Sequence, residues 1–150
     1  MSPLTSALAA AGVAGPVHTF DRPVATAQAA AGVLGCPLGA IANSLVFDAG
    51  GPPVLVVASG AARVDLQLIA SALGAAIVRR ARPEFVLRHT GQQIGGVCPV
   101  GHPAPIRTIV DVDLTGYPRV WAGAGDEYSM FATTFKELVR ITGGTALPVR

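Results

Sequence analysis

The residues best suited to chemistry lie in a glycine-rich segment, TGQQIGGVCPVGH, which runs from Thr90 to His102. Cys98 and His102 are four residues apart there, and a thiol beside an imidazole base can act as a nucleophile. That spacing would align the two side chains on a helix, but the surrounding glycines and prolines break helices. Two interpretations therefore stay open: a Cys98–His102 pair held in a loop, and a tight turn that binds nothing.

The chain has two cysteines, Cys36 and Cys98, and they do not form a CxxC pair. A disulfide, a zinc site shared with a histidine, and two free thiols are all compatible with this number. We favour two buried, reduced thiols, because disulfides are rare in cytosolic proteins and a zinc site would need several distant ligands to meet. The sequence predicts no metal site and no cofactor.

Paired carboxylates occur at Asp111 and Asp113, and at Asp126 and Glu127. Residues i and i+2 point to the same side of a strand, so Asp111 and Asp113 could act together in acid–base or metal chemistry. Such pairs more commonly end a strand and cap the following turn, which is the interpretation we favour. The overlapping segment GAGDEY, residues 123–128, matches a nucleotide-binding glycine loop only in part, because the third glycine is missing.

Four arginines, Arg79, Arg80, Arg82 and Arg88, gather around one predicted strand–helix junction. They could contact phosphates and give salt-dependent binding, or they could form a solvated face. Of the eleven basic residues in the chain, only Lys136 is a lysine. The net charge of +2 neither requires nor excludes a nucleic-acid partner.

The chain of 150 residues is long enough for one domain with a hydrophobic core. Only 13% of the residues are charged, well below the usual quarter, whereas 51% are apolar. Residues 1–20 lack the positive start of a signal peptide, and glycine, proline and polar residues interrupt the uncharged residues 23–47 before they reach membrane-spanning length. We therefore expect a single, soluble cytoplasmic domain over residues 1–150.

The hydrophobic pattern predicts helices and strands in alternation, with hairpin-like neighbours. Helices are predicted to begin at Ser2, Thr26, Asp65, Pro83 and Thr134, the last with a capping box that ends at Glu137. Strands are predicted at Val17–Phe20, Ile41–Phe47, Val54–Ala58, Ala76–Arg80, Ile106–Asp111, Arg119–Gly123 and Ala146–Val149. This mixture indicates an α+β domain on a mixed sheet rather than a doubly wound fold.

The segment Thr90–His102 resembles the signature of the YbaK/ProX family of aminoacyl-tRNA deacylases, which are related to the editing insertion of bacterial prolyl-tRNA synthetase. Further segments resemble the family in the same order along the chain. They are residues 26–47, 65–75, 108–114, 120–126 and 133–144. The resemblance thus covers nearly the whole chain, and the glycine-rich segment is its most specific part.

This resemblance implies a mixed, barrel-like β-sheet with flanking helices. It also implies hydrolysis of the ester between a wrong, small amino acid and a tRNA, commonly the tRNA for proline. The implied partners are the aminoacylated 3′ end of tRNA and prolyl-tRNA synthetase, with no membrane and no cofactor. Family members use no metal and no covalent nucleophile, and backbone N–H groups of a GxxxP element, here residues 95–99, stabilise the oxyanion with help from a tRNA ribose hydroxyl.

The family pattern assigns candidate residues in this chain. The candidate catalytic residues are Gly95, Gly96, Pro99 and Asn43. The candidate substrate-binding residues are Ser44, Gly101, His102 and Asp111. The family usually has lysine at the position of Asn43, and an asparagine can hydrogen-bond a ribose or phosphate but carries no charge. Two functions therefore stay open: an editing deacylase, and a catalytically inactive member that binds tRNA or a synthetase.

Overall fold

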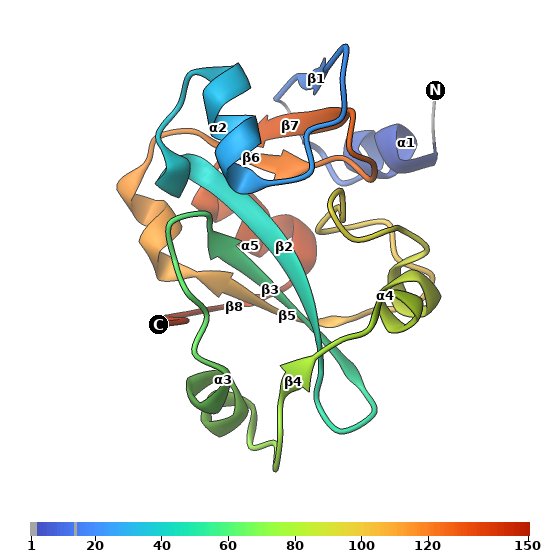
Figure 1. Cartoon of the computed structure of the whole chain (residues 1–150), viewed down its shortest axis with the longest axis vertical. Helices are drawn as coiled ribbons and strands as arrows, with labels where there is room; N and C mark the ends of the chain where they lie inside the picture. The colour runs from blue at the N-terminus through green and yellow to red at the C-terminus, as the bar shows by residue number, and fades with distance from the viewer. Residues whose placement is uncertain (1–2, 14) are drawn as a thin grey trace.

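The computed structural model describes residues 3–13 and 15–150, which form helices and strands in a mixed order (Figure 1). The α-helices are α1 Pro3–Ala10, α2 Ala27–Leu34, α3 Leu66–Leu73, α4 Pro83–Thr90 and α5 Phe135–Thr142, and two short 3₁₀ helices are η1 Leu38–Ala40 and η2 Val112–Gly116. The strands are β1 Val17–Thr19, β2 Ile41–Asp48, β3 Pro53–Ser59, β4 Arg79–Arg80, β5 Arg107–Asp111, β6 Val120–Gly123, β7 Ser129–Thr133 and β8 Thr145–Leu147. The predicted α+β class is confirmed.

The strands form one sheet in the order β1-β7-β6-β2-β3-β5-β8, with β4 added to β2. The β2–β3 hairpin is antiparallel, as predicted, whereas β2 with β6 and β3 with β5 are parallel. The predicted mixed sheet is therefore present. Within the described residues, no pairing between the edge strands β1 and β8 closes it into a barrel.

Helix boundaries follow the predicted local caps. Thr26 Oγ1 accepts a hydrogen bond from the Ala29 N–H at 3.1 Å, and α2 ends at Gly35 with a φ of 67°. Asp65 caps α3 in the same way, because its carboxylate accepts from the N–H groups of the first turn. The predicted cap of α1, Ser2, lies outside the described residues.

Only one of the two hydrogen bonds of the predicted capping box of α5 forms. Thr134 Oγ1 accepts from the Glu137 N–H at 3.1 Å, as the motif requires. The Glu137 carboxylate does not return to the Thr134 N–H but accepts from the Thr133 hydroxyl at 2.6 Å. The hydroxyl competes for the carboxylate because Thr133 ends β7 directly before the cap.

Two strands differ from the sequence-based prediction. Strand β7 was not predicted, because four of its five residues are buried and it therefore lacks the alternation of a half-buried strand. The strand predicted at Ala76–Arg80 is reduced to β4, Arg79–Arg80, which pairs with the end of β2. The exposure of Ile77, 52%, fits its place in a connection outside the sheet.

The core lies on both faces of β3, whose central residues have no more than 1% of their surface exposed. Leu55 and Val57 belong to a cluster that includes residues of α1, α4 and α5, whereas Val54 and Val56 pack with Ile69 of α3. Each such burial contributes about 1.5–3 kcal/mol relative to exposure. The sheet is thereby a rigid frame for β2. No helix in residues 3–13 and 15–150 is long and apolar enough to cross a membrane.

Candidate functional site

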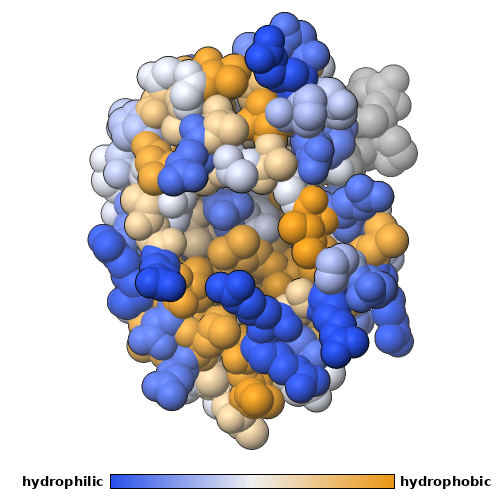
Figure 2. Space-filling model, viewed as in Figure 1, coloured by the Kyte–Doolittle hydropathy of each residue, from blue (hydrophilic) through white to orange (hydrophobic). Residues whose placement is uncertain are grey.

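A cavity of about 600 Å³ opens along β2. Figure 2 shows the hollow near the centre of this face, with apolar side chains on its floor and strongly hydrophilic ones on its rim. Its walls come from β2, the start of α2, the loop before α3, the end of β4 and the glycine-rich loop. Segments far apart in sequence thus meet around one strand.

The hydrogen bonds of β2 determine which of its main-chain groups face the cavity. The Gly60 N–H donates to the Ile41 carbonyl at 2.7 Å, and the Ala49 N–H donates to the Pro52 carbonyl at 2.9 Å. Main-chain groups alternate between the two edges of a strand in an antiparallel ladder. The odd-numbered residues of β2 therefore direct their N–H and C=O groups toward β3, and the even-numbered residues direct theirs to the opposite edge.

That opposite edge is open in its middle. Strand β6 pairs with the first residues of β2, ending at Ala42, and β4 pairs with Phe47 and Asp48. Within the described part of the chain, no strand pairs with Ser44 or Val46 on this edge. From Ala42 to Phe47 the strand advances about 16 Å. We call this stretch the open edge of β2.

Ser44 presents an unsatisfied hydroxyl on the open edge. Its Oγ is buried and has no hydrogen-bond partner within the described residues. Ser44 shares a face of β2 with Ala42 and Val46, which belong to the main core cluster. Asn43 points to the other face and is exposed. Both residues line the cavity, so two neighbouring polar side chains approach it from opposite faces of the strand.

The glycine-rich loop forms the wall across from β2. Gly95 and Gly96 line the cavity, and Gly95 has a φ of 103°, a conformation that other residues rarely adopt. A Cβ on Gly96 would overlap the main chain of Asp126, and the Gly125 N–H donates to the Gly96 carbonyl at 2.9 Å. Gly96 must therefore be glycine for the loop to pack against the turn at residues 125–126.

Side chains hold the loop at Cys98. The Cys98 N–H donates to Gln92 Oε1 at 2.6 Å, and His102 Nε2 lies 2.8 Å from the Cys98 carbonyl oxygen. A carbonyl only accepts, so His102 is the neutral tautomer with hydrogen on Nε2 or is protonated. Burial lowers the pKa of His102 from its ordinary 6.5, and the hydrogen bond to Cys98 opposes that shift. The neutral ring is therefore favoured.

The predicted site residues separate into two groups. Asn43, Ser44, Gly95 and Gly96 line one cavity. Pro99, Gly101, His102 and Asp111 do not line it. Pro99 is buried, and Gly101 has a φ of 83° at the end of the loop. His102 contacts the loop through the Cys98 carbonyl.

Asp111 is fully buried on a different part of the sheet. Its two carboxylate oxygens accept hydrogen bonds from the N–H groups of Ser59 and Asp113, each at 2.9 Å. This is the strand-end capping role that we favoured for the Asp111 and Asp113 pair. The contacts join β5 to the end of β3.

The geometry does not support Cys98 as a nucleophile. The thiol is buried, and burial raises its pKa to about 12, so the thiolate is scarce near neutral pH. His102 contacts the Cys98 carbonyl and not the thiol. Cys36 and Cys98 are both free thiols, as favoured, but only Cys98 is buried, because Cys36 is partly exposed. Within residues 3–13 and 15–150, no three His, Cys, Asp or Glu side chains are grouped to hold a metal ion.

Three charged residues in the cavity wall were not predicted as site residues. Arg80 belongs to the arginine cluster, and Asp126 belongs to the second carboxylate pair, Asp126 and Glu127. The Asp126 carboxylate does cap a turn, because one oxygen accepts from the Tyr128 N–H at 2.7 Å. Arg63 lies in the loop before α3, and no sequence motif marks it.

Comparison with known proteins adds evidence that is independent of this geometry. The sequence pattern of a family described as the aminoacyl-tRNA editing domain matches residues 21–141. The uncharacterized protein YwhH of Bacillus subtilis (strain 168) is 37% identical over 123 residues, which cover 81% of this chain and 78% of that protein.

Solved structures share the fold over nearly its whole length. A crystal structure described as a candidate trans-editing enzyme for prolyl-tRNA synthetase has a TM-score of 0.92 and 37% identity, covering 99% of this chain and 94% of that one. The crystal structure of hypothetical protein APE2540 has a TM-score of 0.90 and 30% identity, covering 99% of each chain. The glycine-rich loop and β2 therefore belong to a fold shared by several proteins.

Proposed function

The chain belongs to the aminoacyl-tRNA editing domain family, and from this membership we propose that it hydrolyses the ester linking a wrong, small amino acid to the 3′ end of a tRNA. The observation that carries the proposal is the shared cavity, in which the open edge of β2 faces the glycine-rich loop. One wall offers polar side chains, and the other offers glycine main chain, with the side chains of Glu127 and Ala25 beside Gly95. The ester carbonyl would lie between them.

The proposed oxyanion donors are the main-chain N–H groups of Gly95 and Gly96. The Gly95 N–H donates no main-chain hydrogen bond within the described residues, and the Gly96 N–H follows a turn at Ile94 and Gly95. An amide that is fixed in place and unpaired can stabilise negative charge that develops on a carbonyl oxygen. The hydrogen bonds at Gly96 and Cys98 hold this loop in position, so little reorganisation is needed during the reaction.

The proposed reaction uses water as the nucleophile. Water adds to the ester carbonyl carbon, the bond from that carbon to the ribose oxygen breaks, and the ribose oxygen receives a proton. A free amino acid and an uncharged tRNA result. We infer that a neighbouring ribose hydroxyl assists, as the family resemblance implies, because Ser44 has no base partner within the described residues and the Cys98 thiol does not line the cavity.

Asn43 and Ser44 would orient the substrate through hydrogen bonds, and Asp126 would bind its α-ammonium group. Asp126 is the one carboxylate among the described residues that line the cavity, and it lies beside Gly96. The rest of the lining combines small side chains, including Ala25, Ala27 and Ala42, with larger apolar ones such as Phe47 and Met130. The tRNA for proline is the favoured substrate, and prolyl-tRNA synthetase the favoured partner, because of the structural similarity to the candidate trans-editing enzyme.

The proposal is tested with the purified protein and a panel of tRNAs, each mischarged with a different small amino acid. We expect release of the amino acid from at least one of them, with the tRNA for proline the best acceptor. A complete panel left intact would contradict the enzymatic proposal. A correctly charged tRNA with a large amino acid is the control and should remain charged.

The identity of Asn43 favours a second function, in which the protein binds tRNA or a synthetase without cleaving the ester. Asn43 supplies no charge at the position where the family usually has lysine. This function predicts salt-dependent tRNA binding and no release of amino acid in the same panel. The two functions therefore differ in the hydrolysis measurement alone.

A further inference from the structure

We propose that Arg80 and Arg63 bind the phosphate of the terminal nucleotide, and that Arg82 and Arg88 bind the phosphates that precede it along a single-stranded RNA end. This inference rests on the proposed function and names residues that replace the charge absent at Asn43. The four arginines come from the loop before α3, from β4, and from the start and last turn of α4.

The side chain of Arg80, on β4, lies on the same face of the sheet as that of Asn43, on β2. Side chains alternate along a strand, so Asn43 and Phe47 point to one face. Arg80 lies directly opposite Phe47 in the antiparallel β2–β4 pair, and opposite residues share a face. The guanidinium group of Arg80 therefore supplies positive charge on the Asn43 side of the strand. Lys136, the single lysine of the chain, lies on α5 and does not line the cavity.

The ion pairs among the described residues do not involve the four arginines that are proposed to bind phosphate. Arg79 is neutralised, because its guanidinium lies 3.3 Å from the Asp48 carboxylate. Within the described residues, none of Arg63, Arg80, Arg82 and Arg88 forms an ion pair, and all four are exposed. Exposed arginines without an internal acid can pair with a phosphate in two parallel hydrogen bonds.

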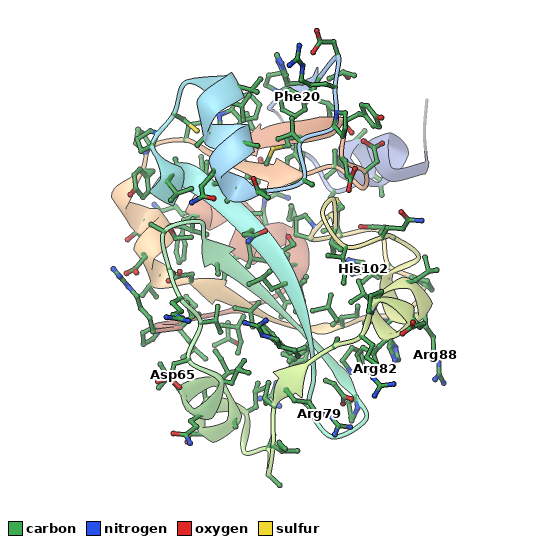
Figure 3. All side chains as sticks on the ribbon, in the orientation of Figure 1. Phe20, Asp65, Arg79, Arg82, Arg88 and His102 are labelled. Atoms are coloured by element: carbon green, nitrogen blue, oxygen red, sulfur yellow. The ribbon has the colours of Figure 1, made fainter. Side chains whose placement is uncertain are left out.

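Arg80 also connects the cavity to a second depression, of about 480 Å³, because it lines both. The second depression is lined by the cluster arginines, Phe85 and two acids, Asp48 and Glu84. Figure 3 shows Arg82 and Arg88 on this side of the molecule, near α4 and below the glycine-rich loop. A continuous basic path therefore leads out of the cavity. The aromatic ring of Phe85 lines the same depression, where it packs against the main core cluster and lies 4.5 Å from the ring of His89.

The charges in the cavity are ordered along β2. Asp126 lies beside Gly96, in the turn that follows β6, and β6 pairs with the first residues of β2. Arg80 lies at the end that pairs with β4. The carboxylate thus stands near the proposed position of the acyl group, and the guanidinium group comes from the strand that pairs with the far end of the open edge. An aminoacyl nucleotide has the same polarity, with its ammonium group at one end and its phosphate at the other.

The test measures binding of a short single-stranded RNA with the unpaired 3′ sequence of tRNA, without an amino acid, at several salt concentrations. We expect R80Q and R63Q each to weaken binding, and the double variant to reduce the slope of log K against log salt by about 0.7, the value for one phosphate contact on a single strand. R82Q and R88Q should weaken binding only to an RNA long enough to reach them.

Arg119→Gln is the matched control, because Arg119 is exposed, forms no ion pair within the described residues and lines neither depression. It removes the same charge and should leave the slope unchanged. R80K should retain the salt slope while losing affinity, because lysine keeps the charge but not the paired hydrogen bonds. If R80Q and R63Q bind the RNA as R119Q does, the inference is overturned.

The readouts separate this inference from the proposed function. If the wild-type protein cleaves a mischarged tRNA, R80Q should raise KM with little change in kcat, because a phosphate contact is present before and during the reaction. Cleavage with unchanged KM in R80Q and R63Q would overturn the inference and leave the proposed function intact. Arginine-dependent RNA binding without any cleavage would support the inference and contradict the proposed function.

Discussion

The amide oxygen of Gln92 accepts a hydrogen bond from the main-chain N–H of Cys98 at 2.6 Å, and both residues are buried. This contact spans the glycine-rich loop, because Gln92 precedes Gly95 and Cys98 follows Gly96. Gln92 is itself held through its N–H, which donates to Thr90 Oγ1 at 3.0 Å at the end of α4. The position of the glycine main chain is therefore set by a helix end and one amide side chain.

Gln92→Met tests this support. Methionine has a similar length but cannot accept the hydrogen bond, so the buried Cys98 N–H would lose its partner. We expect the free energy of unfolding in urea to fall by about 1–3 kcal/mol and kcat/KM for ester hydrolysis to fall with it. Gln93→Met is the control at the exposed neighbouring position and should change both little. Equal stabilities of the two variants would show that Gln92 does not hold the loop.

Gly96→Ala tests the close approach of the loop to residues 125–126. A Cβ at this position would overlap the main chain of Asp126, so the loop must move away from the turn. We expect the variant to lose activity while it remains folded, and circular dichroism would verify that it is folded. Full activity in folded Gly96→Ala would exclude this loop from the oxyanion site.

Gly32→Ala is the glycine control for that experiment. Gly32 lies inside α2, is exposed, and has open space where a Cβ would stand. Alanine there should raise the free energy of unfolding by about 0.5–1 kcal/mol, because glycine is a poor helix former. Activity should be unchanged.

The parts of the fold that depend on neighbouring residues were predictable from the sequence. Thr26, Asp65 and Thr134 cap helices because each side chain reaches N–H groups two or three residues away. The β2–β3 hairpin follows from two apolar runs with a short turn between them. Four predicted site residues also line one cavity, but their grouping came from a family resemblance and not from local pattern.

The remaining features depend on contacts between distant segments. The open edge of β2 exists because β6 and β4 pair with its two ends and leave Ser44 between them. No local pattern shows where a partner strand stops. Arg63 reaches the cavity because the β3–α3 connection passes beside β2, and Gln92 acts through Cys98 six residues away in an irregular loop. Hydrophobic periodicity carries no information about such contacts.

His102 should make stability depend on pH. Burial lowers the pKa of His102 in the folded protein, so below about pH 6.5 the unfolded chain binds more protons at this residue than the folded chain does. Its contribution to stability is complete above pH 6.5 and is lost as the pH falls through the lower, folded pKa.

Urea unfolding between pH 7.5 and pH 5 measures this effect, with His102→Gln as the variant, since an amide can still donate to the Cys98 carbonyl. We expect wild-type stability to fall more steeply than that of His102→Gln over this range. Parallel curves for wild type and His102→Gln would contradict the assignment.

Ser44→Ala should raise the free energy of unfolding of the protein and lower its hydrolytic activity. The Ser44 Oγ is buried without a hydrogen-bond partner in the described residues, so removing it should raise the free energy of unfolding by about 1 kcal/mol. We expect kcat/KM to fall, because the substrate loses a hydrogen bond. Ser59→Ala is the contrasting variant, because the Ser59 hydroxyl donates to the Gly39 carbonyl at 2.8 Å. Removing this hydroxyl should lower the free energy of unfolding. A destabilised Ser44→Ala would mean that the hydroxyl has an internal partner.

Asn43→Lys tests whether charge at this position limits the reaction. Asn43 is exposed on β2, so lysine can be accommodated with little change in stability, and its ammonium group would rise on the same face as Arg80. We expect tRNA affinity or turnover to increase, because a charged contact to phosphate is roughly twice as strong as a neutral one. Thr19→Lys, exposed on the edge strand β1, adds the same charge away from the cavity and should have no such effect. If the wild-type protein does not cleave the ester and Asn43→Lys does, the residue at position 43 is the reason for the missing activity. Unchanged binding and turnover in Asn43→Lys would instead show that position 43 does not hold the substrate.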